Sequence, residues 1–134
     1  MRITFKKNPD VAFLVLRLGL AFVFIWFSVN QFLNPGDWTS YLPSWVGSLG
    51  VSAESFVLMN ALVELVAGIL LALGAWTRLA ALVLGVHLIG IALSVGYNAV
   101  AVRDIGLAIA TFALVWGGAG LWSIDQAVEA KIAG

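Results

Sequence analysis

The chain has 134 residues, of which 62% are hydrophobic and only 10% are charged, and its formal net charge is zero. Soluble domains carry about 25% charged residues, so a mean hydropathy of +1.03 indicates a membrane protein. We expect one membrane domain, residues 1–134, with most of its mass in lipid. The chain has no cysteine, which excludes thiolate catalysis and cysteine-ligated metal centres within it. It also has no basic run beyond the N-terminus, which excludes nucleic acid as a partner.

The first apolar run, residues 11–33, follows a short basic segment that resembles the start of a signal peptide. The run is too long for such a peptide, contains Arg17 and has no evident small-residue cleavage site. It is therefore predicted to be an uncleaved first membrane span, with Asp10 capping its first turn.

Three further apolar runs follow, at residues 56–74, 79–96 and 105–122. The shortest of the four runs gives about 27 Å of helix at 1.5 Å per residue, which is close to the hydrocarbon thickness of a bilayer. Each run is preceded by a residue that caps helices: Ser52 or Ser55, Thr77, and Asp104. The fold class predicted is an all-α membrane protein, a bundle of four transmembrane helices.

Two segments outside the spans carry signals of their own. The long connection 34–54 has no positive charge and contains Trp38, Tyr41 and Trp45. Such rings prefer the headgroup level, so an anchor in the outer interface is the favoured interpretation, and a lid over a site between the helices is the alternative. The tail 123–134 begins with a capping box and predicts a short surface helix.

The distribution of lysine and arginine predicts the orientation. With four spans, both termini and the turn 74–78 share one side of the membrane. That side carries Arg2, Lys6, Lys7, Arg78 and Lys131, whereas the other side carries Arg103. The positive-inside rule therefore places both termini in the cytoplasm.

Small residues spaced by four along the spans predict close helix packing. The pairs are Gly68 and Ala72, Ala81 and Gly85, Gly106 and Ala110, and Ala113 and Gly117. They indicate a compact bundle and carry no information about its chemistry.

Glu64 is a carboxylate near the middle of the second apolar run. A charged side chain there costs about 2.5–3.5 kcal/mol on insertion scales, so it requires a partner, a polar cavity or a proton. Counted along the helices, Glu64 lies about 15 Å from the cytoplasmic side, Arg17 about 9 Å and His87 about 12 Å. Three different helices thus place polar groups in a similar layer, where Arg17 or His87 can pair with Glu64.

A functional and a structural interpretation remain open for these groups. In the first, His87 donates to the carbonyl of a quinone or to a lipid head group, and Glu64 accepts a proton. In the second, Arg17 forms an ion pair that fixes the bundle or extends to the interface, Asn60 holds Glu64 from one turn away, and His87 bonds a backbone carbonyl. Arg103 and Asp104 are either an interfacial charge with a helix cap or the mouth of a cavity.

The residue inventory limits cofactors and catalysis. A single histidine excludes a bis-histidine haem within one chain, and Glu64 with His87 provides too few ligands for a metal. Phosphate-binding loops and a Ser-His-Asp arrangement are also lacking. We expect no metal or covalently bound cofactor, and a chain that is not catalytic on its own.

Five segments resemble the DoxX family. They are Arg17–Phe24, Glu64–Gly74, Trp76–Ala81, Arg103–Ala108 and Gly118–Asp125. The resemblance implies a small four-helix protein of the inner (plasma) membrane. The wider family includes a subunit of thiosulfate:quinone oxidoreductase and proteins that look like membrane partners of redox or oxidative-stress proteins.

The resemblance also implies which polar positions matter. The polar positions of the family correspond in this chain to Arg17, Glu64, Arg78, Arg103 and Asp104. Family members often have a glycine and a lysine near the end of the first span, where this chain has Ser28 and Gln31.

Three functions are consistent with the sequence. The first is an accessory or docking subunit of a membrane redox system, which contacts quinone or lipid around Glu64 and has a protein partner or forms a homo-oligomer. The second is a small transporter or proton-conducting bundle, and the third is a structural subunit of a larger respiratory or photosynthetic complex. A transporter usually contains broken helices or internal repeats, so the first and third functions are favoured.

Overall fold

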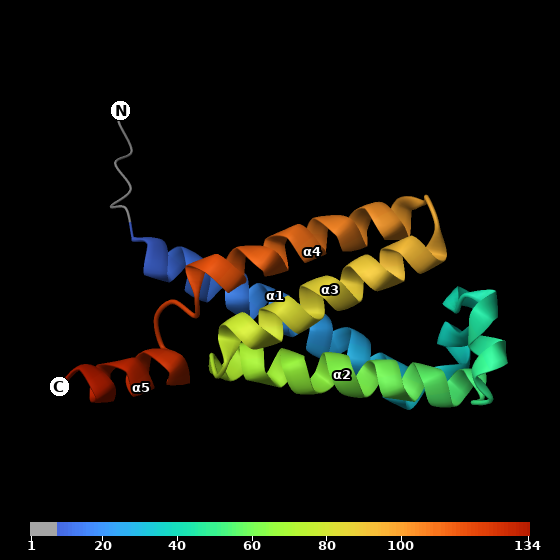
Figure 1. Ribbon diagram of the computed structural model, residues 1–134, viewed down its shortest axis with the longest axis horizontal. Helices are drawn as coiled ribbons and strands as arrows, with labels where there is room; N and C mark the ends of the chain where they lie inside the picture. The colour runs from blue at the N-terminus through green and yellow to red at the C-terminus, as the bar shows by residue number, and fades with distance from the viewer. Residues whose placement is uncertain (1–7) are drawn as a thin grey trace.

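The computed structural model describes residues 8–134, and these residues form helices joined by short segments (Figure 1). The long helices are α1 (Pro9–Leu33), α2 (Ala53–Leu73), α3 (Thr77–Val95) and α4 (Ala99–Gly117). The shorter ones are the 3-10 helices η1 (Pro35–Tyr41) and η2 (Ser44–Leu49) and the terminal helix α5 (Ile124–Ala133). The four long helices are apolar and long enough to cross a membrane, which confirms the predicted all-α class and the number of spans. The predicted basic residues Arg2, Lys6 and Lys7 lie outside the described residues.

The first two long helices begin close to the predicted positions. The Asn8 side chain accepts a hydrogen bond from the Val11 amide (3.4 Å), so α1 begins two residues early and Asp10 lies in its first turn instead of capping it. Ser52 accepts from the Ser55 amide (3.1 Å) and caps α2, as one of the two predicted alternatives.

The predicted cap of α3 is wrong. Thr77 is the first residue of the helix, and Trp76 precedes it in the left-handed region with φ 47°. The carboxylate of Asp125, from the start of α5, accepts hydrogen bonds from the amides of Trp76 and Thr77, each 2.8 Å long. A residue distant in the sequence therefore provides the cap, which local pattern cannot indicate.

The predicted limits of the fourth span, 105–122, are also wrong. Asn98 accepts from the Ala101 amide (3.0 Å), so α4 begins at Ala99 and places Asp104 inside the helix rather than at its cap. The helix ends at Gly117, because Gly118 adopts φ 79°. The apolar residues 99–102, which precede the charged pair Arg103–Asp104, already belong to the helix.

The helices form two antiparallel hairpins. α1 packs mainly against α2, and α3 mainly against α4. Figure 1 shows the hairpins close together at the end that holds the 74–76 turn and α5, and spread apart at the opposite end, where η1 and η2 lie. We call these the turn end and the loop end. The start of α1 and the end of α4 both lie at the turn end, as an even number of spans requires.

The core of the bundle is apolar and begins at the turn end. Leu20, Phe24, Leu71, Leu84 and Leu114 are buried in one cluster that includes all four long helices. Large apolar side chains also cover the outside of every long helix. Water would disfavour such a surface, whereas the hydrocarbon of a bilayer accepts it.

Two glycines allow long helices to pack closely against one another. A Cβ added to Gly85 would lie 2.5 Å from a ring carbon of Phe112, so α3 and α4 meet at this glycine. A Cβ on Gly117 would overlap the ring of Phe13, which joins α4 to α1. By contrast, Gly106 has no atom within 4 Å of such a Cβ, so not every predicted small residue marks a contact.

Candidate functional site

A cavity of about 580 Å³ lies between the two hairpins toward the loop end. Its volume is within the range of roughly 300–1,000 Å³ that is usual for small-molecule sites. All four long helices and the η1–η2 segment contribute to the wall. Most of the wall is apolar, and it is rich in aromatic rings: Phe24, Trp26, Phe27, Trp38, Tyr41, Trp45 and Phe56.

The segment between α1 and α2 covers the cavity. The Trp38 ring lies edge-on to the Phe27 ring of α1, with centroids 5.6 Å apart, and the Trp45 ring lies edge-on to that of Phe56 on α2, at 5.9 Å. Edge-to-face pairs at such separations are favourable contacts. The loop is thus attached to both helices of its hairpin and forms part of the cavity wall.

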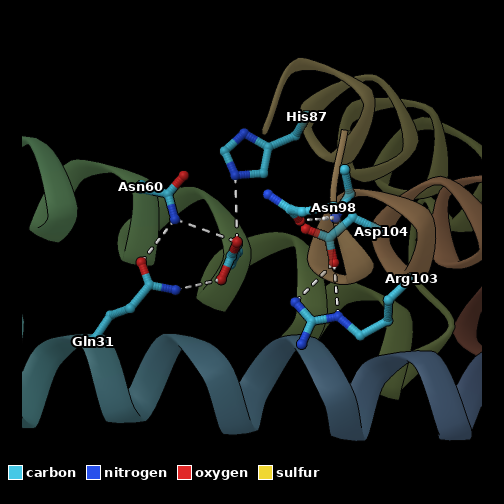
Figure 2. A network of polar contacts seen from close by, with 8 residues as sticks. Gln31, Asn60, His87, Asn98, Arg103 and Asp104 are labelled. Carbon is cyan, nitrogen blue, oxygen red and sulfur yellow. Dashed lines mark hydrogen bonds and ion pairs between the residues drawn. The ribbon is translucent and has the colours of Figure 1, made fainter. Parts of the chain in front are cut away.

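The polar part of the wall is a cluster of four side chains from three helices: Gln31, Asn60, Glu64 and His87 (Figure 2). We call it the Glu64 cluster. Gln31 Nε2 donates to Glu64 Oε2 (2.8 Å), and Asn60 Nδ2 donates to Glu64 Oε1 (3.3 Å) and to Gln31 Oε1 (2.7 Å). His87 Nε2 lies 3.4 Å from Glu64 Oε1. The cluster thus joins α1, α2 and α3 around one carboxylate.

The contacts of Glu64 suit an acceptor of hydrogen bonds. Only 4% of this residue is exposed, and each of its carboxylate oxygens receives an amide donor. The buried Nε2 atom of His87 approaches Glu64 without the geometry of a hydrogen bond, and within the described part of the chain it has no other hydrogen-bond partner. An imidazole and a carboxylate side by side in a cavity wall can give or take a proton from a bound molecule.

A second polar pair lies in the cavity wall on α4. Arg103 Nε and Nη2 are each 2.9 Å from Asp104 Oδ1; Arg103 is half exposed and Asp104 is buried. The guanidinium carbon lies 5.1 Å from the centroid of the Phe27 ring, within cation–π range, and so connects α4 to α1. Of the two interpretations given for this pair, the structure supports a position at the cavity.

Arg17 is not part of the Glu64 cluster, and the hypothesis that it pairs with Glu64 is wrong. Its guanidinium is fully buried toward the turn end and donates to five backbone carbonyls. Two belong to the end of α2 and three to the segment after α4: Leu71 (2.7 Å), Ala72 (2.8 Å), Ala119 (2.8 Å), Leu121 (3.1 Å) and Trp122 (3.0 Å).

The direction of the side chains explains why Arg17 and Glu64 do not meet. Side chains on a helix lean toward its N-terminus. Because α1 and α2 are antiparallel, Arg17 leans toward the turn end and Glu64 toward the loop end. At the end of α2, the Leu71 carbonyl also accepts from the Gly74 amide (3.1 Å), and Ala72 belongs to the last turn, where carbonyls lack partners within the helix.

The remaining candidates divide between the two ends of the bundle. The cavity brings together Asn60, Glu64, His87, Arg103 and Asp104. Arg78 is exposed in the first turn of α3, at the turn end, and does not line the cavity.

The sequence interpretation did not include Gln31 among the site residues. This residue is buried and donates to Glu64. The spacing of Gln31 along the chain could have indicated that it faces the interior. Arg17, Phe24 and Gln31 recur every seven residues and share the buried face of α1.

The DoxX family model matches residues 12–97. The match extends from α1 to the end of α3 and includes the whole Glu64 cluster, whereas the Arg103–Asp104 pair follows it. No match was found among curated proteins or among solved structures.

Proposed function

The chain belongs to the DoxX family and is a multi-pass membrane protein, and we propose that it binds the polar head of a membrane-dissolved molecule, of which a quinone is the best fit. In this role it is an accessory subunit of a membrane redox system. The cavity contains both parts that such a ligand needs, namely aromatic rings for a flat head and the Glu64 cluster for its oxygens.

The observation that carries this proposal is the state of His87. Its Nε2 atom is buried in the cavity wall, 3.4 Å from Glu64 Oε1, and has no hydrogen-bond partner among residues 8–134. An unpaired buried polar atom costs about 1–3 kcal/mol. A carbonyl oxygen on the ligand would restore a hydrogen bond there, and Glu64 alongside would accept the proton when the ligand carries a hydroxyl.

The accessory role follows from what these side chains can do. A carboxylate and an imidazole move protons but carry no electrons, so a redox reaction of the bound head requires an electron carrier on a partner protein. Catalysis by this chain alone is therefore not part of the proposal.

A proton-conducting bundle is less well supported. Between Glu64 and the Arg17 layer, the inward positions of α1 and α2 are apolar: Leu20, Phe24, Ala67 and Leu71. Thr111 is buried on α4, where its hydroxyl donates to the Leu107 carbonyl (2.7 Å). The apolar side chains offer no relay for protons along the bundle axis, so the polar groups of the cavity serve a binding site near the loop end rather than a path through the bundle.

Tryptophan fluorescence tests the proposal, because Trp26, Trp38 and Trp45 line the cavity. A short-chain quinone titrated into the purified protein in detergent is expected to quench the emission and saturate. His87→Leu should weaken the apparent affinity about tenfold, the equivalent of the 1.4 kcal/mol expected for one hydrogen bond.

The controls separate binding from nonspecific quenching. Trp38→Phe should remove part of the saturable quenching, whereas Trp116→Phe, outside the cavity, should not. Glu64→Gln should weaken binding while the protein still accumulates and keeps its helical circular dichroism. A Glu64→Gln protein that fails to fold would identify a structural acid, and quenching that is the same in Trp38→Phe and in wild type would contradict the proposed site.

A further inference from the structure

The two sides of the cavity that face the bilayer differ in how they are closed. Between α1 and α4, the Arg103 guanidinium lies over the Phe27 ring, and Phe27 is in contact with both Trp26 and Trp38. These successive contacts connect α4, α1 and the η1 segment beside the cavity. A ligand passing on this side would have to separate all of them.

The opposite side, between α2 and α3, has free space at one glycine. Gly90 lines the cavity and is exposed, and a Cβ placed on it would meet no atom within 4 Å. At 100° per residue it lies about 140° around α3 from Gly85, the residue packed on α4. Gly90 is therefore on the side of α3 turned away from α4, where α2 and α3 diverge from their shared turn (Figure 1).

The residues around Gly90 form a continuous strip from the Glu64 cluster to the outside. His87, Gly90, Ile91 and Ser94 share one face of α3, and all of them line the cavity. The Ser94 hydroxyl donates to the Gly90 carbonyl (2.8 Å), so its hydrogen is already bonded within the helix. Beyond His87 the strip thus presents small or apolar groups with little demand for water.

We propose that the cavity opens into the bilayer between α2 and α3 across Gly90, and that the apolar tail of the ligand leaves the cavity there. This inference rests on the proposed function, and it narrows the ligand class to compounds with a polar head and an apolar tail that arrive from the hydrocarbon layer. The head lies against His87 and Glu64, while the tail crosses Gly90 and continues among the lipids. The lid formed by η1 and η2 keeps the cavity closed toward the headgroup side.

Gly90→Phe is the test, and Gly106→Phe is its matched control. Both glycines are exposed in a long helix and have no atom within 4 Å of an added Cβ, but Gly106 does not line the cavity. The Cβ of the new side chain therefore meets no neighbouring atom of the described residues at either position. Circular dichroism and thermal unfolding in detergent check that both variants fold, and Gly90→Leu provides a second, smaller obstruction.

The affinities of two quinones with the same head are measured, one bearing a methyl group and the other a ten-carbon chain. Gly90→Phe is expected to weaken binding of the long-chain quinone at least about tenfold, or 1.4 kcal/mol, and to leave that of the methyl quinone nearly unchanged. Gly90→Leu should have a smaller effect of the same kind, and Gly106→Phe should affect neither ligand.

The possible failures are distinguishable. If Gly90→Phe and Gly106→Phe bind the long-chain quinone equally well, the tail does not pass Gly90, while binding of the methyl quinone that depends on His87 would still support the proposed function. If Gly90→Phe weakens both ligands equally, the tail path is also wrong, because the ring then acts on the head. If the wild-type protein shows no saturable, His87-dependent binding of the methyl quinone, the proposed function fails and the tail path fails with it.

Discussion

Replacing Arg17 by methionine is expected to destabilise the whole turn end of the bundle. Methionine approximates the length of the side chain and removes its charge and donors. The guanidinium donates to five carbonyls, at 2.7–3.1 Å, that belong to α2 and to the segment between α4 and α5. Those oxygens would then lose this partner, and the contacts with Leu71 and Ala119 are buried, so water does not readily replace it there.

The magnitude follows from two opposing effects. Hydrogen bonds to charged groups contribute about 1.5–3 kcal/mol each, so five of them would nominally exceed the stability of many domains. The variant also avoids burying a guanidinium, which offsets several kcal/mol. The net loss expected is about 3–5 kcal/mol, the range for breaking a buried charged network. The stability of Arg17→Lys should lie between those of the wild type and Arg17→Met, since an ammonium group has three donors for five acceptors.

Unfolding in mixed detergent micelles, followed by circular dichroism, measures the loss, and limited proteolysis reports whether α5 is released. Arg103→Met is the control, because this arginine is half exposed and contacts one carboxylate oxygen. An Arg17→Met protein that unfolds within about 1 kcal/mol of the wild type, with α5 still protected, would refute the reasoning.

Two further substitutions test the contacts that hold the helices together. Asp125→Ala removes the acceptor of two amides at the start of α3, so it should lower the free energy of unfolding by about 1–2 kcal/mol and expose α5 to protease. Glu129→Ala changes an exposed residue of α5 and should leave stability and protease resistance unchanged. Unchanged protease resistance in Asp125→Ala would show that the cap does not hold α5. In Gly117→Leu the new side chain would overlap the Phe13 ring, so the free energy of unfolding should fall by about 1–3 kcal/mol. Gly106→Leu adds the same side chain where the added Cβ has open space, and it should change that free energy by less than about 0.5 kcal/mol. Equal stability of the two leucine variants would contradict the close approach of α1 and α4.

Hydropathy predicted the fold because each span is an apolar run long enough to cross the hydrocarbon layer. It failed at α4, where the polar pair Arg103–Asp104 lies inside a helix. A charged pair in a cavity wall has the same local sequence as a charged pair at a helix end, so only the surrounding structure distinguishes the two.

The depth of polar residues predicted the candidate site in part. Glu64 and His87 lie in one layer and approach each other, as their distances from the helix ends indicated. Arg17 also appeared to share that layer, but depth counted on the backbone ignores the lean of a side chain, which is opposite on antiparallel helices. The position of the loop over the cavity could not be predicted, because tertiary contacts of its tryptophans set it.

The two hairpins meet at one end of the molecule and spread apart at the other, and this separates two kinds of evolutionary constraint. Substitutions near Arg17 and Asp125 act on the joint that holds both hairpins and should be purged in any descendant of this chain. Substitutions among the aromatic rings at the loop end alter the shape of the cavity without disturbing the contacts that hold the hairpins together. A lineage can therefore change what it accommodates at the loop end while it inherits the same scaffold.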